Sequence, residues 1–199
     1  MKTTLFPNWT LDETDNTGAI SEYFHNEKMP FTEEIMINCL KIKRNKYEIY
    51  WAVLALRMIG TQKSIQYLKE VTTYKNLDVQ GASILTIAHL AEGSENEFLA
   101  SLLLNQDFKA KWYAVVAFNH KPDGKAVPYA AEYGFKTIKS SKNKPEAGSL
   151  IVEYLARFAP ENEQAKKIFA RINKDFENLS SQEKDVFTTN FPHIFNGLI

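Results

Sequence analysis

The sequence predicts an all-α fold, arranged as an α-solenoid of about five antiparallel helix pairs with a C-terminal capping helix. The first observation is a step of about 31 residues that links similar side chains, as in Ala52, Ser83 and Ala114. The second is a spacing of three or four between apolar residues, which is typical of helices buried on one face. The third is that no segment alternates apolar and polar residues as a half-buried strand does.

The same step recurs in both helices of each predicted pair. In the first helices it links Leu56, Ile87 and Phe118. In the second helices it links three sets of residues: Tyr67, Phe98 and Tyr129; Leu68, Leu99 and Ala130; and Val71, Leu102 and Tyr133. A hairpin of this length cannot bury its apolar face alone, so a recurrence at this period predicts hairpins stacked on one another.

The expected domain organisation is an irregular arm at residues 1–17 followed by a single repeat domain at 18–199, with its core at 45–140. Pro7 and the polar cluster at 12–16 interrupt any regular element in the arm. A degenerate helix pair should follow the arm. Terminal repeats are often atypical because one of their faces meets water.

Helices of the first repeats are predicted at 32–44, 47–59 and 62–74, with Gly60 as a left-handed stop. Asp78 is the expected N-cap of a helix at 79–91. Gly93 should end that helix. Ser94 and Glu97 have the spacing of a capping box for a helix at 96–104.

Helices of the later repeats are predicted from Asp107 to Phe118, over 125–138 with Pro128 near its start, over 148–158 and over 161–175. Proline is tolerated in the first turn because the N–H that it lacks has no partner there. A polar connector at 140–145 lengthens the spacing. Ser180 or Ser181 can cap a last helix.

The composition predicts a chain that folds without disulfides or metals. Its 199 residues include one cysteine, Cys39. A chain of this length buries about 70% of its unfolded surface. A single cysteine fits a reducing compartment, so we expect a cytoplasmic protein. The residues from Met1 to Trp9 lack the apolar core of a signal peptide, and no apolar run is long enough to span a membrane.

The charge balance argues against nucleic acid as the main partner. Lysine and arginine together number 24, and aspartate and glutamate also number 24. Such a chain has no net field to attract a polyanion. Only four of the basic residues are arginines, whereas base and phosphate recognition favours the guanidinium group.

No catalytic, metal or cofactor site is expected. The histidines are scattered and have no ligand or triad spacing, and they are His25, His89, His120 and His193. His89 and Glu92 could share a helix face, but two ligands make a poor metal site. Cys39 lies on an apolar helix face and is expected to be a buried, inert thiol.

Two features have alternative interpretations. Trp51 and Trp112 are either packing residues between helix layers or solvent-facing anchors for a partner. Four lysines form a basic run near a predicted helix end, which is explained either by the helix dipole or by an acidic ligand. These lysines are Lys136, Lys139, Lys142 and Lys144.

Helical periodicity predicts one binding surface. If Ile65, Leu68 and Val71 face the core, the residues between them turn outward, and the repeat places later residues alongside. The predicted binding stripe is mildly acidic and consists of Gln66, Lys69, Glu70, Thr73, Glu97, Ser101 and Glu132. It is either a solvated face or a groove for a basic or mixed-charge protein segment.

The repeat resembles the HEAT and HEAT-like helical repeats of the short kind. The first-helix pattern is Ala52, Ala55, Leu56, Ile59 and Gly60, and the second-helix pattern is Ala126, Val127 and Pro128. The likeness extends from about Gly18 to Asn178. A first-helix basic residue common in such repeats is matched only by Lys111. The resemblance implies a curved right-handed stack whose second helices line a concave surface that commonly holds another protein.

The resulting hypothesis is a non-enzymatic protein-binding or scaffold module, most concretely an adaptor or a toxin-immunity protein. The alternative, also by resemblance, is a HEAT-like DNA glycosylase that removes alkylated bases. Such an enzyme needs a basic groove, an aromatic residue and a carboxylate, for which Trp112 and Asp107 are the nearest candidates. The HEAT-like chromophore lyases are a third possibility, which rests on the resemblance alone.

Overall fold

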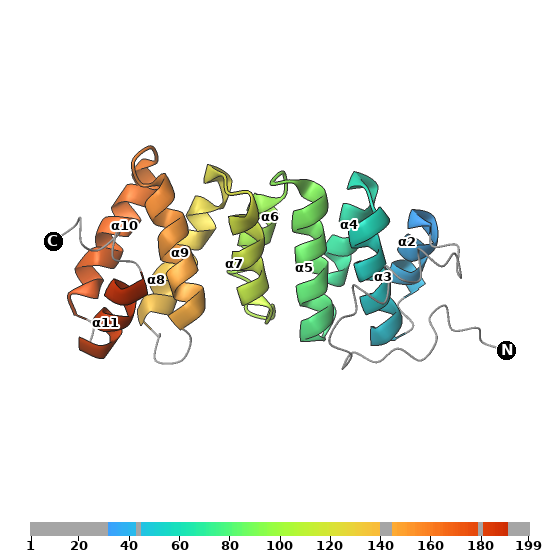
Figure 1. The fold of residues 1–199 in the computed structure, drawn as a ribbon, viewed down its shortest axis with the longest axis horizontal. Coiled ribbons are helices and arrows are strands. Elements are labelled where there is room, and N and C mark those ends of the chain that lie inside the picture. The colour runs from blue at the N-terminus through green and yellow to red at the C-terminus, as the bar shows by residue number, and fades with distance from the viewer. Residues whose placement is uncertain (1–31, 43–44, 140–144, 179–180, 191–199) are drawn as a thin grey trace. The chain divides into compact units, whose positions relative to one another are not determined.

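A computed structural model describes residues 32–42, 45–139, 145–178 and 181–190. Over these residues the secondary structure is helical and contains no strand (Figure 1). The all-α prediction is therefore confirmed at this level. The arm predicted at 1–17 and the first helix of the first pair lie outside the described residues.

The chain divides into two compact units. Among the described residues, the first unit contains 32–42, 45–95 and Phe108–Tyr113. The second contains Asn96–Asp107 and the described chain from Ala114 onward. The single domain predicted for 18–199 stays a prediction.

Four helices form the body of the first unit: α2 (Glu33–Ile42), α3 (Lys46–Ile59), α4 (Gln62–Val71) and α5 (Leu77–Ala91). Each of them begins with a side chain that caps free backbone N–H groups, and at α2 the Thr32 hydroxyl accepts from the Ile35 N–H at 3.3 Å. Asn45 caps α3, Thr61 caps α4 and Asn76 caps α5. The predicted helices at 47–59 and 62–74 therefore begin within one residue of the observed α3 and α4.

Five α-helices and one 3-10 helix lie within the described part of the second unit. They are α6 (Asn96–Ser101), η1 (Gly124–Ala126), α8 (Val127–Lys139), α9 (Pro145–Phe158), α10 (Glu163–Phe176) and α11 (Ser181–Asn190). The remaining helix, α7 (Lys111–His120), starts in the first unit and continues in the second. Pro128 is the second residue of α8, where the N–H that it lacks has no helical partner.

The residues linked by the 31-residue step share their degree of burial. Ala52, Ser83 and Ala114 are fully buried, as are Leu56, Ile87 and Phe118. In the second-helix positions, Tyr67, Phe98 and Tyr129 are all half-buried. Leu68, Leu99 and Ala130 are all buried. The third set differs at one member, because Val71 and Leu102 are buried and Tyr133 is half-buried. The recurrence therefore corresponds to recurring environments.

Helices α3 and α5 pack side by side and run in the same direction (Figure 1). Near their middles, the hydroxyl of Thr86 donates to the carbonyl of Val53 at 3.4 Å. At their ends, a Cβ built on Gly60 would lie 3.1 Å from Cδ1 of Leu90. First helices one repeat apart are thus held in parallel register within the first unit.

Second helices also pack on the next second helix of their own unit. Helix α2 contacts α4 in the first unit, and α8 contacts both α6 and α10 in the second. In both units, an amide side chain at the start of a second helix donates a hydrogen bond to a backbone carbonyl of the following helix pair. Gln62 Nε2 donates to the Leu90 carbonyl at 2.7 Å in the first unit, and Asn96 Nδ2 donates to the Lys121 carbonyl at 2.7 Å in the second.

Three predicted helix starts are wrong. Asn76 rather than Asp78 caps α5, because its Oδ1 accepts from the Val79 N–H at 3.0 Å. The Ser94 hydroxyl donates to the Ala91 carbonyl at 2.8 Å instead of capping the next helix. Helix α7 begins at Lys111 and not at Asp107. Asn and Asp cap almost equally well, so sequence alone does not decide between positions two residues apart.

The predicted left-handed stop at Gly60 is also wrong. Gly60 is extended, with φ −72° and ψ 159°. A glycine suits this position because a Cβ would lie 2.4 Å from the Leu56 carbonyl oxygen. The left-handed conformation occurs instead at the end of α5, at Glu92 (φ 50°) and Gly93 (φ 96°).

Candidate functional site

The outward face of α4 carries four of the seven predicted binding residues. Gln66 and Glu70 are exposed on α4, and Thr73 is exposed just beyond the last residue of the helix. Ile65 and Leu68 are buried on the opposite face. The orientation predicted from periodicity matches this burial, while a role in binding stays a prediction.

Lys69, the fourth residue on this face, is held by a carboxylate of the same unit. Its Nζ lies 2.6 Å from Oε2 of Glu95, and the two side chains are 33% and 23% exposed. A partly shielded pair of this kind is screened by salt less than an exposed one. The pair compensates the charge of Lys69 and leaves Glu70 as the exposed carboxylate of α4.

Helix α2 extends the same side of the first unit, because it packs against α4. Lys41 Nζ lies 4.7 Å from the centroid of the Tyr67 ring, within the range of a cation–π contact. Glu34 and Asn38 are exposed on α2. The face formed by α2 and α4 therefore carries both signs of charge beside an accessible aromatic ring.

The other three predicted residues belong to the second unit. Glu97 on α6 is exposed and accepts a hydrogen bond from the Tyr129 hydroxyl at 3.3 Å. Desolvation, together with the charge and the hydrogen bond of Glu97, raises the pKa of the Tyr129 phenol. Ser101 donates to the Phe98 carbonyl at 2.7 Å, and Glu132 is exposed on α8.

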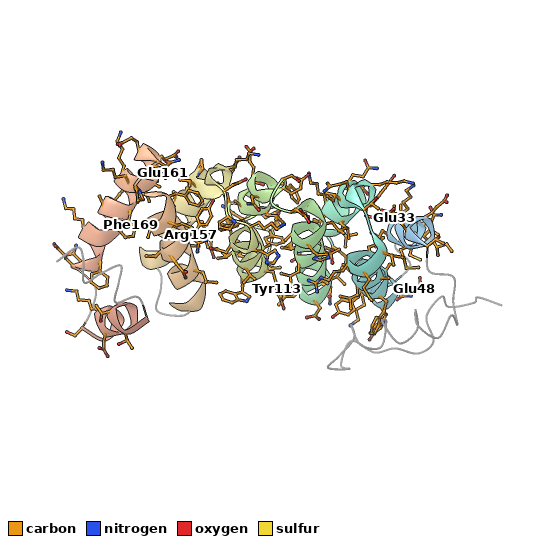
Figure 2. All side chains as sticks on the ribbon, turned by 45° about the horizontal axis from the view of Figure 1, so that its top comes forward. Glu33, Glu48, Tyr113, Arg157, Glu161 and Phe169 are labelled. Carbon is orange, nitrogen blue, oxygen red and sulfur yellow. The ribbon has the colours of Figure 1, made fainter. Side chains whose placement is uncertain are left out.

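Glu33 was not predicted as a site residue, although its carboxylate accepts hydrogen bonds from three donors. Its Oε1 accepts from the Thr61 N–H at 2.9 Å, from the Thr61 hydroxyl at 2.9 Å and from the Ser64 hydroxyl at 2.6 Å. Glu33 is the first residue of α2 (Figure 2). The donors lie at the start of α4. Ser64 lies one repeat step after Glu33, so the 31-residue recurrence contained a signal for this contact.

The Glu33 contact should make stability depend on pH. Burial alone would raise the pKa of the carboxyl, but the hydrogen bonds from Ser64 and Thr61 and the charge of Lys63 hold that pKa below its ordinary value of 4.5. A lowered pKa stabilises the folded state above pH 4.5, and this contribution is lost as the pH falls through the folded-state value. Glu33→Gln should therefore flatten the acid limb of the stability profile.

Urea unfolding at a series of pH values, from pH 7 to below the ordinary pKa of 4.5, measures the free energy of unfolding of the wild type and of Glu33→Gln. At pH 7 we expect Glu33→Gln to lower the free energy of unfolding by about 1 kcal/mol, because an amide replaces a charged acceptor. Glu34→Gln, on the exposed neighbouring residue, is the matched control and should change little. Equal acid limbs for the wild type and Glu33→Gln would contradict the prediction.

The residues considered for other chemistry differ in burial. Trp51 is fully buried and packs edge-on against Tyr50, whereas Trp112 is 40% exposed. Asp107 is exposed, and its backbone N–H donates to Asn105 Oδ1. Cys39 is buried and is not part of a disulfide. No group of three metal-binding side chains occurs in the described part of the chain.

Several remaining candidates cannot be placed. His25, His193, Lys142 and Lys144 lie outside the described residues, as do the side chains of Lys136 and Lys139. His89 is exposed on α5, and Glu92 is exposed just beyond the end of this helix. Within the described ranges, every helix falls short of the length and hydropathy needed to cross a bilayer.

Comparisons with known proteins identify no relative. No protein-family model matches the chain, no curated protein matches it, and no solved structure matches it.

Proposed function

We propose that the chain is a non-enzymatic protein-binding module that holds a mixed-charge or basic segment of another protein on its second-helix face. In its most concrete form it is an adaptor or a toxin-immunity protein. The proposal includes a HEAT-like arrangement in which successive hairpins stack and the second helices line a concave surface. The observation that carries it is the exposed polar face on α2 and α4 above a buried, recurrent core.

The packing within each unit supports the stack. First helices α3 and α5 are parallel neighbours, and second helices α2 and α4 are neighbours as well. The second unit repeats the second-helix contacts through α6, α8 and α10. Within each unit, neighbouring helices thereby pack against one another, as the helices of stacked repeats do.

The chemistry of the face supports the type of partner. Glu34 and Glu70 are exposed carboxylates of the first unit, and Lys63 is an exposed cation on α4. Tyr67 offers an aromatic surface, with Lys41 above its ring. Aromatic residues are enriched at binding hot spots, and complementary charges select the partner and its register. A segment with both signs of charge and an excess of lysine or arginine would pair with Glu34 and Glu70 on this face of the first unit.

Affinity purification with matched variants tests the proposal. The full-length chain is recovered from the cells that naturally make it, as the wild type, as Gln66→Lys/Glu70→Lys, and as the control His89→Lys on the first helix α5. We expect one stoichiometric protein with the wild type and the control. Its recovery should fall at least about tenfold with the α4 variant, which corresponds to about 1.4 kcal/mol.

Two results would overturn the proposal. The first is the absence of a stoichiometric partner under several lysis conditions. The second is salt-sensitive binding of duplex DNA at low ionic strength, since that is the behaviour expected of the glycosylase alternative.

A further inference from the structure

A second exposed surface lies at the amino-terminal ends of the first helices. The Val53–Thr86 hydrogen bond and the Gly60–Leu90 approach place α3 and α5 in parallel, with their starts level to within about one turn. A Cβ built on Gly81 would lie 2.7 Å from the Tyr113 ring, so the start of α7 packs against the start of α5. Three helix starts of the first unit are therefore neighbours.

Large apolar side chains are exposed at each of these three starts. Tyr47 on α3 is 40% exposed, Leu77 on α5 is 50% exposed and Trp112 on α7 is 40% exposed. Only Ile42 and Met58 are comparably exposed large apolar residues elsewhere in the described part of the chain. We call the surface formed by Tyr47, Leu77 and Trp112 the apolar edge. Clustered exposure of this kind marks interaction sites, whereas single exposed residues are ordinary.

The surroundings of the apolar edge are electropositive. Four lysines lie on or beside the three helix starts, against the carboxylates of Glu48 and Asp78. The lysines are Lys46, Lys75, Lys109 and Lys111. Lys46 Nζ lies 4.8 Å from the centroid of the Tyr47 ring, so charge and aromatic surface are presented together. The amino-terminal ends of the parallel helices α3 and α5 add positive partial charge.

We propose that the apolar edge docks an acidic segment of another protein that carries leucine or aromatic side chains. Neighbouring helix axes are about 8–10 Å apart, so the three helix starts span about 16–20 Å. An extended segment of about six residues covers that length. Its apolar side chains contact Tyr47, Leu77 and Trp112. Its carboxylates pair with Lys46 and Lys75.

This surface is separate from the proposed binding face on α2 and α4. The apolar edge is formed by the starts of first helices, whereas Gln66 and Glu70 lie on a second helix. The two surfaces also have different chemistry, because the edge is electropositive and the α4 face presents a carboxylate. Substitutions on one surface should therefore leave binding at the other unchanged.

Fluorescence anisotropy with a defined probe tests the inference. The probe is a short labelled peptide in which glutamates alternate with leucine and phenylalanine, added to the full-length chain at physiological and at high salt. Leu77→Ala/Trp112→Ala should weaken binding at least tenfold. Lys46→Glu/Lys75→Glu should weaken it to a similar extent, and high salt should do the same, because the charges are exposed and screened.

Matched controls distinguish binding at the apolar edge from non-specific binding and from binding at the α2 and α4 face. Met58→Ala removes an equally exposed apolar side chain at the opposite end of α3, and Lys63→Glu reverses an exposed charge on α4. Both variants should bind the probe as the wild type does, as should Glu70→Lys. A peptide with lysine in place of glutamate should not bind. Circular dichroism confirms that each variant is folded.

Three results would overturn the inference. One is probe binding that is absent or unaffected by Leu77→Ala/Trp112→Ala in folded protein. Another is a dimer in sedimentation that Trp112→Ala dissociates, which would assign the edge to a second copy. The third is tighter probe binding when Asp12, Glu13 and Asp15 are neutralised in the full chain, which would assign the edge to the chain's own amino-terminal segment.

Discussion

Phe118→Ala should lower the free energy of unfolding by about 3–5 kcal/mol, the range for truncating a buried phenylalanine. Phe118 is fully buried on α7, and its ring meets Tyr154 of α9 edge-on, with centroids 4.9 Å apart and planes at 73°. Truncation leaves a cavity and also removes this aromatic contact, which is worth about 0.5–1.5 kcal/mol beyond its buried area. Urea unfolding followed by circular dichroism measures the loss.

The control for Phe118→Ala lies two residues away on the same helix. His120 is exposed at the last residue of α7, and His120→Ala at pH 8 should stay within about 0.5 kcal/mol of the wild type. Repeat arrays can lose cooperativity, so tryptophan fluorescence should follow the same transitions. A loss below about 1 kcal/mol for Phe118→Ala would contradict the burial assigned to this ring.

Burial in this chain could be predicted from the sequence because the chain repeats itself. Ala52, Ser83 and Ala114 are linked by the 31-residue step, and all three are fully buried. A helical period identifies which face of one helix is apolar. The repeat step then transfers that assignment from one hairpin to the next, which is why Tyr67, Phe98 and Tyr129 are also alike in exposure.

Helix ends were harder to predict, since several residues compete to cap the same turn. Asn76 and Asp78 are both good caps, and the backbone conformation before α5 selects Asn76, which is extended at φ −145°. Gly60 was expected to supply a left-handed turn, but the need for glycine there is steric. A short sequence window contains no information about the distance from Gly60 to the Leu56 carbonyl.

The candidate surface was predictable in its orientation and not in its electrostatics. Periodicity placed Gln66 and Glu70 outward, as they lie. The ion pair between Lys69 and Glu95 joins two residues that do not follow the repeat step, so it depends on the path of the connection before α6. The Glu33–Ser64 hydrogen bond does follow the step and was available in principle.

Gly134→Ala should destabilise the chain by about 2 kcal/mol, although alanine is the better helix former. A Cβ built on Gly134 of α8 would lie 2.7 Å from Cγ2 of Ile151 on α9. Carbon atoms prefer about 3.5–4.0 Å. Ile151 is fully buried, and its branched side chain is stiff, so it cannot turn aside. Overpacking strain near the upper end of 1–3 kcal/mol then outweighs a propensity gain of about 1 kcal/mol.

A double-mutant cycle separates that strain from the propensity gain. Ile151→Ala alone opens a cavity and should cost about 2–5 kcal/mol, but it also removes the Cγ2 atom that opposes a new Cβ. In that background Gly134→Ala should stabilise by up to about 1 kcal/mol, so the sign of its effect reverses. Gly124→Ala, whose Cβ would meet nothing within 4 Å, is the matched control. Stabilisation by Gly134→Ala in the wild-type background would mean that α8 and α9 approach less closely than described.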